Sequence, residues 1–359
     1  MPTKFEDIRT TVFRLPLAGK LRWGKSSVLS ELRHVLVQVT LNDGSRGFAE
    51  APPRPTIYGE TAGSVVGIIR DELAPRLIGK DTDQIHLMDE VKNNHTAKGA
   101  IDIAMHDALA NSQGRSLAEY LGVQAEKIRV SYIMGINDLD AMLQEADRVY
   151  KQGVRVLKVK VGRDFAADVQ CIQRIKNDLA DDLAIYVDAN ECFTDDNVVS
   201  RLSQLADIGV LYCEEPLPVE KIELRSQIRD QSLMPLIADD SAFSVRDLNR
   251  ELLMNTFDIL NIKTARTGYT QSRKMLELAI NHNKGVMLGS QASSALGTAR
   301  TALFAALPGV DHPSELSFFL KAESNIVSTL PCIRDGYMDV KALADVTLDE
   351  DLLREATCR

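Results

Sequence analysis

The sequence predicts an α/β fold in which a (β/α)8 TIM-type barrel follows a smaller N-terminal α+β domain. The barrel is predicted because short apolar runs recur about every 25 residues from residue 128 onward, with helical patterns between them. The N-terminal domain is predicted because strand patterns come first there and helical patterns follow. A chain of 359 residues is long enough for both.

The N-terminal domain is expected to span residues 1–125 and to open as a β-hairpin. Its predicted elements are a strand at 34–41 ("HVLVQVTL"), a turn at 42–45 ("NDGS"), a strand at 46–52 ("RGFAEAP") and helices at 59–79 and 97–122. Gly114 interrupts the second helical pattern, and Gly122 ends it.

Residues 126–325 form the predicted barrel, because the strand-and-helix unit repeats eight times there. Its strands are expected at "IRVSYIMG" near 128, "VLKVKVG" near 156, "LAIYVDAN" near 183, "VLYCEEP" near 210, "PLIADDS" near 235, "FDILNIK" near 257, "GVMLGSQ" near 285 and "PSELSFFL" near 313. The tail, 326–359, is too short to stand alone, and we expect it to pack back on the N-terminal domain.

Composition and charge exclude several classes of function. The formal net charge of −9 and the absence of Lys/Arg clusters argue against nucleic-acid binding and against attachment to a membrane surface. The five cysteines are odd in number and form no CxxC, so we expect reduced thiols rather than disulfides or a zinc site. No apolar stretch has the length of a signal peptide or a membrane span, so a cytoplasmic protein is expected.

Charged residues gather at the carboxyl ends of the predicted strands, where barrel enzymes place their catalytic groups. Acidic residues end the third, fourth and fifth strands, and their convergence would be costly without a compensating cation. Oxygen ligands without His or Cys favour Mg²⁺, with Mn²⁺ as the alternative. The acidic residues are Asp188, Glu214, Glu215, Asp239 and Asp240.

Lysines flank these acids on both sides. Lys158 and Lys160 lie on the second strand and Lys263 ends the sixth. A metal ion and a neighbouring ammonium both lower the pKa of a lysine, so one amine can act as a base near neutral pH. We predict Lys160 as the base that abstracts the proton α to a carboxylate. Lys158 would tune it or hold the carboxylate, and Lys263 would be a second acid or base on the opposite side.

Taken together, the motifs resemble the enolase superfamily, specifically its muconate lactonizing enzyme (muconate cycloisomerase) subgroup, and the resemblance covers essentially the whole chain. The motifs are specific in this order and spacing rather than singly. They are "GFAEAPP", "IYGET", "AIDIAMHDAL", "KVKVG", "VDAN", "CEEPL", "IADDS", "LNIKTARTG" and "GSQASSALG".

The resemblance implies a modified, enolase-like barrel whose N-terminal domain caps the active site. It implies that Asp188, Glu214 and Asp239 bind Mg²⁺ and that Lys160 and Lys263 are the two bases. Further residues are expected to contact the substrate or to support the metal ligands: Asn190, Asp240, Gln291, Glu315, Trp23 and Tyr58. Trp23 and Tyr58 lie in the family's specificity loops. Here these loops would be residues 16–30, around Trp23, and the stretch around Pro53 to Tyr58. Family members are commonly symmetric assemblies, so a homo-oligomer is expected.

The substrate implied by the resemblance is a small carboxylate, and the reaction is an isomerisation through a metal-stabilised enediolate. Dipeptide epimerases carry an Asp-x-Asp pair on the eighth strand, whereas this chain has Glu315-Leu316-Ser317, which looks more like the cycloisomerases. A cycloisomerase or a racemase is therefore favoured. The alternatives are N-acylamino acid racemase, o-succinylbenzoate synthase or dipeptide epimerase activity, a dehydratase-type lyase, and a barrel that binds without catalysis.

Overall fold

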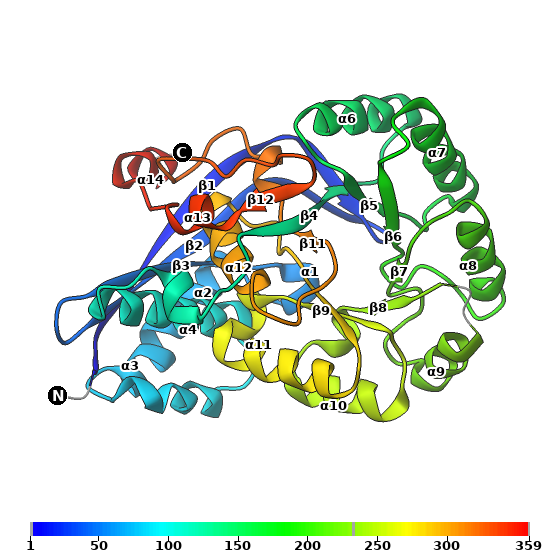
Figure 1. The fold of residues 1–359 in the computed structure, drawn as a ribbon. Helices are drawn as coiled ribbons and strands as arrows, with labels where there is room; N and C mark the ends of the chain where they lie inside the picture. Colours follow the sequence, from blue (N-terminus) through cyan, green and yellow to red (C-terminus); the bar gives the residue numbers. More distant parts are fainter. Residues whose placement is uncertain (1–2, 232–233, 358–359) are drawn as a thin grey trace.

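Eight parallel strands surround the core of the barrel (Figure 1). Seven of them, β4 to β10, lie side by side in chain order, and the eighth, β11, pairs with β4. The computed structural model describes residues 3–231 and 234–357. The strands are β4 (Lys127–Met134), β5 (Val156–Lys160), β6 (Ala184–Asp188), β7 (Cys213–Glu214), β8 (Leu236–Ala238), β9 (Ile259–Ile262), β10 (Gly285–Leu288) and β11 (Ser314–Glu315). The predicted barrel is confirmed.

Outer helices follow the first seven of these strands, and local caps start several of them. Asp138, Asp164 and Ser244 each accept a backbone N–H of the first turn of α6, α7 and α10, respectively. The helices are α6 (Leu139–Lys151), α7 (Phe165–Asp178), α8 (Val198–Asp207), α9 (Ile222–Gln231), α10 (Val245–Met254), α11 (Thr264–Asn281) and α12 (Ala295–Ala305).

The eighth unit differs from the prediction. We expected a strand over "PSELSFFL" and a helix after it, but β11 has two residues and is followed by the short 3₁₀ helix η4 (Phe318–Lys321). The apolar run misled because Phe318 and Phe319 are buried by the 3₁₀ turn and not by a continuing strand. Within the described residues, β11 is therefore the one barrel strand that is not followed by an outer α-helix of the barrel.

The cap is an antiparallel sheet of β1 (Phe5–Trp23), β2 (Ser27–Leu41) and β3 (Arg46–Ala51), which is covered by α4 (His95–Ser112). The turn between β2 and β3 and the interruption at Gly114 are as predicted. The helix predicted at 59–79 is α2 (Ala62–Ile68), the π-helical turn η1 (Ile69–Leu73) and α3 (Ala74–Leu77). The remaining cap helices are α1 (Pro55–Tyr58), η2 (Thr82–Glu90) and α5 (Leu117–Leu121).

Residues 16–30 are mostly paired strand and not the loop that we expected. Leu21 pairs with Leu29 and Trp23 with Ser27, so β1 and β2 continue to a short turn. The pairing register shifts between Pro16 and Leu21, where Gly19 has a φ of 95°. We call Trp23–Ser27 the hairpin tip.

Cap and barrel dock through close backbone approaches and buried ion pairs. A Cβ on Gly99 of α4 would lie 2.5 Å from the carbonyl oxygen of Ala265 in α11, so this helix crossing requires glycine. Arg300 of α12 donates to Asp107 of α4 over 3.0 Å, and both side chains are buried. Helix α12 is buried along its whole length because β3, α5 and η4 pack around it.

The C-terminal segment crosses both parts. β12 (Tyr337–Asp339) pairs antiparallel with β4 of the barrel, and α13 (Val340–Ala344) packs on α12 and α5. α14 (Glu350–Thr357) packs on β1 of the cap, and Figure 1 shows this red helix beside the blue strand. The domain boundaries at 125 and 325 stay predictions.

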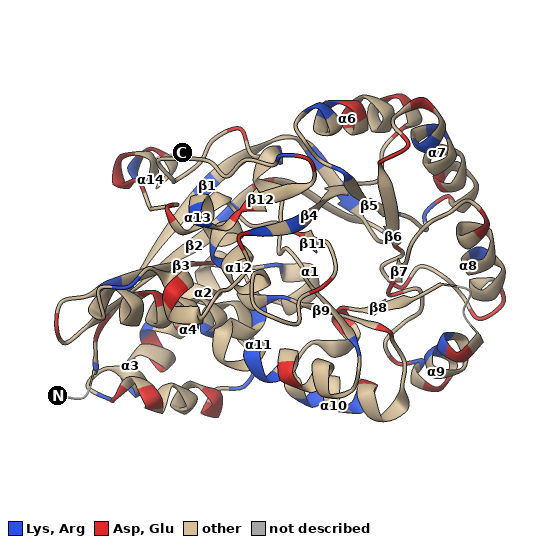
Figure 2. Cartoon of the chain, viewed as in Figure 1, with Lys and Arg blue, Asp and Glu red and all other residues tan. Residues whose placement is uncertain are grey.

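The outer helices carry acidic and basic residues side by side, as Figure 2 shows for α6 to α9. Of the helices in the described ranges, none is both long enough and apolar enough to cross a membrane. The cysteines Cys171, Cys192, Cys213 and Cys332 are free thiols, and Cys358 lies outside the described residues.

Candidate active site

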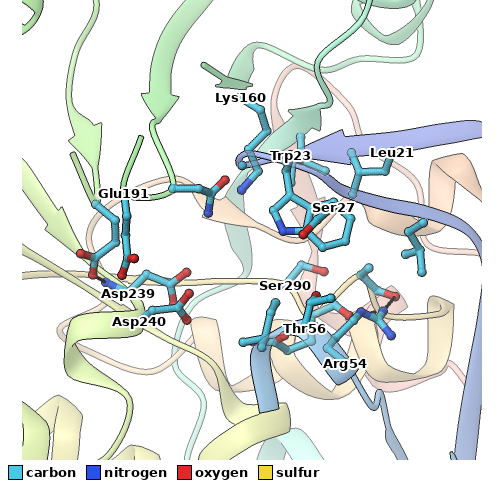
Figure 3. Close-up of a pocket in the computed structure, with 18 of the residues that line it drawn as sticks. Leu21, Trp23, Ser27, Arg54, Thr56, Lys160, Glu191, Asp239, Asp240 and Ser290 are labelled. Atoms are coloured by element: carbon cyan, nitrogen blue, oxygen red, sulfur yellow. Dashed lines mark hydrogen bonds between the residues drawn. The ribbon is translucent and has the colours of Figure 1, made fainter. Parts of the chain in front are cut away.

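A cavity of about 650 Å³ lies at the mouth of the barrel, beneath the hairpin tip. In Figure 3, Leu21, Trp23 and Ser27 reach in from the cap hairpin, whereas Lys160 and Asp239 come from the barrel. Most of the predicted site residues line it: Trp23, Lys158, Lys160, Asn190, Asp239, Asp240, Lys263, Gln291 and Glu315. Asp188 and Glu214 are fully buried against the lysines that line it.

Lys158 can occupy a buried strand because three carboxylates surround its amine. All five residues of β5 are buried, and Lys158 is only 1% exposed. Its Nζ donates to Glu214 Oε1 and Glu315 Oε2 over 2.7 Å each and lies 3.0 Å from Asp188 Oδ2. Burial alone would favour a neutral amine, so these partners are what keep the ammonium in the interior.

The other two lysines are held in the same way from separate strands. Lys160 at the end of β5 donates to Asp188 Oδ2 over 2.5 Å. Lys263, directly after β9, donates to Asp239 Oδ2, directly after β8. The two amines therefore belong to different carboxylates, and both side chains line the cavity.

The carboxylate contacts raise the pKa of Lys158 and of Lys263. The lowering that we expect from a metal ion stays a prediction. Burial lowers the pKa of Lys158, but Asp188, Glu214 and Glu315 together raise it well above its ordinary value. Burial likewise lowers the pKa of Lys263, and Asp239 with Asp240 raises it above its usual range. The physical cause is that a carboxylate which hydrogen-bonds an ammonium stabilises its charged form.

The carboxylates show how strongly negative charge is concentrated here. Burial raises the pKa of Asp188, but Lys158 and Lys160 lower it to well below its usual range. Burial raises the pKa of Glu214, and although Lys158 opposes this, Asp188 and Asp239 hold it well above its usual range. Of the three predicted metal ligands, Glu214 is the one whose pKa is raised, and additional positive charge would favour its ionised form.

The donor set fits a hard divalent cation. Asp188, Glu214 and Asp239 are oxygen donors on three neighbouring strands, and Oδ1 of Asp239 is buried without a hydrogen-bond partner among the described residues. In this conformation lysines lie between the acids, and no group of three or more His, Cys, Asp or Glu in the described ranges is already arranged around one point. The assignment of ligands stays a prediction.

Glu215 supports this set from behind. Its Oε1 accepts the N–H groups of Asp239 (2.7 Å) and Ser241 (2.9 Å) and the Ser241 hydroxyl (2.5 Å). Burial raises its pKa to about 7, although Arg225 and these hydrogen bonds act against that rise. Glu215 has a φ of 39°, a strained value for a residue with a side chain, so the surrounding fold imposes its position.

The remaining predicted residues fall on different sides of the cavity. The Asn190 N–H donates to Asp188 Oδ1 over 2.9 Å, and its Cβ lies 3.7 Å from where a side chain on Gly24 would begin. Asp240 pairs with Arg266 over 3.3 Å. Tyr58 is the exception: it does not line the cavity, and its ring packs on Phe243, with ring centroids 5.3 Å apart.

Two arginines near the cavity escaped the sequence analysis. Arg163, in the loop after β5, donates to the carbonyls of Gly24 (2.7 Å), Trp23 (3.2 Å) and Ser27 (3.3 Å) and so fixes the hairpin tip. Arg54, between two prolines of the cap, bonds to the loop after β10. Both partners are remote in the sequence, and the only available signal was a charged residue inside "PPRP".

The fold and the site thus define a capped barrel enzyme whose strand ends oppose lysines and carboxylates. One family model, described as "Enolase C-terminal domain-like", matches residues 141–345. A second, "Mandelate racemase / muconate lactonizing enzyme, N-terminal domain", matches residues 22–122. The chain belongs to the enolase superfamily, in the group of muconate lactonizing enzyme and mandelate racemase, as the resemblance implied.

Similar proteins include several kinds of isomerase. A muconate lactonizing enzyme from Mucobacterium Smegmatis, solved with muconolactone, has a TM-score of 0.93 and 34% identity, with 98% of this chain and 99% of that chain covered. An L-amino acid-D/L-Glu epimerase of Francisella philomiragia is 28% identical over 84% of this chain and 87% of its own length. An N-succinyl-L-Arg/Lys racemase of Bacillus cereus is 26% identical over 99% and 98%. This protein is accordingly an enzyme of the isomerase class, and members of its superfamily use Mg²⁺.

Proposed function

We propose that this protein is a Mg²⁺-dependent cycloisomerase of the muconate type, which forms a lactone from an unsaturated dicarboxylate. The observation that carries the proposal is that the polar side chains at the end of the eighth strand already have partners within the protein. Glu315 is buried and its Oε2 is bound to Lys158, while the Ser317 hydroxyl donates to the carbonyl of Ser131 over 2.8 Å. An acid already neutralised in this way is a poor partner for a substrate ammonium, whereas the cavity presents lysines to an acid.

The residues of the cavity are suited to proton transfer at a carbon next to a carboxylate. Attack of one carboxylate oxygen on the double bond forms the C–O bond of the lactone and moves an electron pair onto the other carboxylate as an enediolate. A lysine ammonium then donates its proton to the α-carbon, so the dicarboxylate dianion becomes a lactone monoanion and the neutral amine regains a proton from water. Lys160 is the proposed acid and base, with Lys263 on the opposite side, as predicted from the sequence.

Asp188, Glu214 and Asp239 would hold the metal ion, which would supply positive charge where the enediolate develops. This chain's residues provide the rest. The same carboxylates bind Lys160 and Lys263, so sharing their charge with a cation would weaken the contacts that hold these amines protonated. The hairpin tip, fixed by Arg163, covers the cavity and limits access of water.

A racemase or epimerase is the second candidate. It is favoured by the placement of Lys160 and Lys263 on different strands with different carboxylate partners, since racemisation needs one base for each face of the α-carbon. The N-acylamino acid and dipeptide versions, and o-succinylbenzoate synthesis, would use the same two lysines. A barrel that binds a ligand without catalysis would not need both lysines.

The test is turnover of a small set of acids by the purified protein with Mg²⁺. Loss of the diene absorbance of cis,cis-muconate, with a lactone identified by NMR, is the expected result. Exchange of the α-proton of N-acylamino acids or dipeptides in D₂O, without any lactone formation, would replace the proposal by the second candidate. Absence of both reactions would contradict both.

A further inference from the structure

The loop between β10 and α12, residues 289–294, forms one wall of the cavity. Ser290, Gln291 and Ala292 line it. Ala292 has a φ of 55°, a left-handed conformation that residues with a side chain adopt when their surroundings impose it. The shape of this wall is therefore not an intrinsic preference of its sequence, and its cause lies in what the loop contacts.

Gln291 presents an unused donor to the cavity. Its side chain is only 4% exposed, and Nε2 has no hydrogen-bond partner among the described residues. A buried amide N–H without an acceptor costs free energy, and nearly all such groups in folded proteins are satisfied. Because Gln291 lines the cavity, an acceptor oxygen of a bound ligand is the partner that would complete it.

Two charged cap residues hold the backbone of this loop. Arg54 Nη2 donates to the carbonyl oxygens of Gln291 over 2.6 Å and Ala292 over 3.3 Å. Glu50 Oε1 accepts the N–H of Ser294 over 2.8 Å. The carbonyls on either side of the strained residue and the amide shortly after it are thus fixed from the cap.

Arg54 is itself fixed and has little freedom to act on a ligand. It is only 5% exposed, its Nη1 donates to the carbonyl of Pro53 over 2.7 Å, and its Nη2 lies 3.1 Å from His34 Nε2. Burial lowers its pKa to about 10, although Tyr58 and Glu50 oppose that change, so the guanidinium remains charged at neutral pH. Arg54 also lines the cavity, but the bonds of its Nη1 and Nη2 go to the protein, as expected of a positioning residue.

We propose that Arg54, together with Glu50, positions the 289–294 loop so that the Gln291 amide donates to an oxygen of the acid substrate. Arg54 is a positioning residue and Gln291 the specificity-determining one. The inference rests on the proposed function for the substrate class, namely an acid with an acceptor oxygen beyond the carboxylate at the metal. It makes the contacts of Arg54 and Glu50 with this loop a condition for recognition by the barrel.

The first test is a double-mutant cycle on the turnover of cis,cis-muconate. Gln291→Ala and Arg54→Met are each expected to raise KM about tenfold, the effect of one lost hydrogen bond, with kcat changed less than about threefold. The double variant should be no worse than either single variant, because both changes remove one contact. Effects on KM that multiply would overturn the inference.

Arg300→Met is the matched control. Arg300 is also a buried arginine that joins cap and barrel, but its partner Asp107 lies on the cap helix α4, and neither residue lines the cavity. KM should stay unchanged in this variant. A rise equal to that of Arg54→Met would show that loosened docking alone explains the effect, and would overturn the positioning role.

A second measurement does not depend on activity. Hydrogen exchange of the 289–294 amides, Ser294 above all, should be faster in Arg54→Met than in the wild type and unchanged in Arg300→Met. Arg54→Lys retains the charge and should restore part of the protection of these amides from exchange. It replaces Arg54→Met in this measurement if the Met variant does not fold. Unchanged exchange in the Arg54 variants would overturn the inference.

Wild-type protein without muconate turnover would contradict the proposed function, while the exchange data would still decide the role of Arg54.

Discussion

Glu215 illustrates how a single residue can serve the site without facing the reacting atoms. It accepts the backbone N–H groups of Asp239 and Ser241 and the Ser241 hydroxyl, and so fixes the chain at a predicted metal ligand. The Glu215→Gln variant keeps the size of the side chain but replaces a charged acceptor by a neutral amide. Because residues that orient metal ligands typically contribute 10- to 100-fold to affinity, Mn²⁺ binding should weaken by about that factor.

The measurement is a Mn²⁺ titration followed by EPR. Glu191→Gln is the control, since Glu191 also lines the cavity yet has no hydrogen bond to Asp239 in the described structure. Equal affinities for wild type and Glu215→Gln would show that Glu215 does not position the ligand.

His95 gives a prediction for the effect of pH on stability. It packs on Phe243 with ring centroids 4.8 Å apart, and burial, followed by the charges of Arg266 and Lys98, lowers its pKa from 6.5 to about 4. Between these two values the unfolded chain binds a proton that the folded chain does not. The free energy of unfolding therefore falls as pH falls from 6.5 to 4, and this contribution is intact above 6.5.

His95→Gln should make that fall less steep. One proton allows at most about 1.4 kcal/mol per pH unit, and partial exposure of the ring reduces this. Urea unfolding at several pH values measures the slope, with exposed His282→Gln as the control. An unchanged slope in His95→Gln would mean that the folded protein protonates His95 as readily as the unfolded chain does.

The sequence revealed the strand-end residues and missed their supports for one physical reason. Side chains at i and i+2 of a strand share a face, so Lys158 and Lys160 could be placed together before the structure was known. Arg54 and Arg163 bond to backbone carbonyls of remote segments, and a carbonyl carries no sequence signal. The carboxylates that raise the pKa of Lys158 were also not assigned to it from the sequence, because strand alternation does not reveal which side chains hydrogen-bond across the barrel.

At the scale of elements, the long periodic patterns predicted their helices and strands correctly. The patterns of the eighth unit and of the cap hairpin did not. Gly114 and Gly122 ended helices as expected, since both have positive φ angles that glycine adopts freely. The eighth unit and the hairpin tip were misjudged, because tertiary packing decides there whether an apolar run is strand, turn or 3₁₀ helix. Two-residue strands such as β7 and β11 have too few residues for any periodicity.

The hairpin tip is the element whose order we expect to depend on one side chain. Arg163→Ala removes three donors to backbone carbonyls of Trp23, Gly24 and Ser27, so the tip should open more often. Amide exchange across 22–28 should accelerate about fivefold or more, as the loss of roughly 1 kcal/mol implies. Arg174→Ala on the outside of α7, where Arg174 bonds Asp178, is the control and should leave it unchanged. The same rate in both variants would contradict the role given to Arg163.

At the scale of the whole molecule, the cavity belongs to neither part alone. The barrel supplies lysines and carboxylates, and the cap supplies the hairpin tip and Arg54. Gly99 and the Arg300–Asp107 pair bring the two together over a buried α12. Because the catalytic side chains and the cover of the cavity come from different segments, a change in the cap can alter the substrate without a change at the strand ends. The similar proteins carry the names of different reactions, namely muconate lactonization, epimerisation and racemisation.

Proton transfer by the two lysines at a metal-bound acid is tested most directly by exchange at the α-carbon of muconolactone in D₂O, followed by NMR. Wild-type protein with Mg²⁺ should incorporate deuterium, and EDTA should abolish it. Lys160→Ala and Lys263→Ala should each slow exchange by at least about 100-fold, the usual contribution of a general acid or base. Lys176→Ala, on outer helix α7, should not. Exchange that persists in both lysine variants, or that is equally fast without metal, would contradict this assignment.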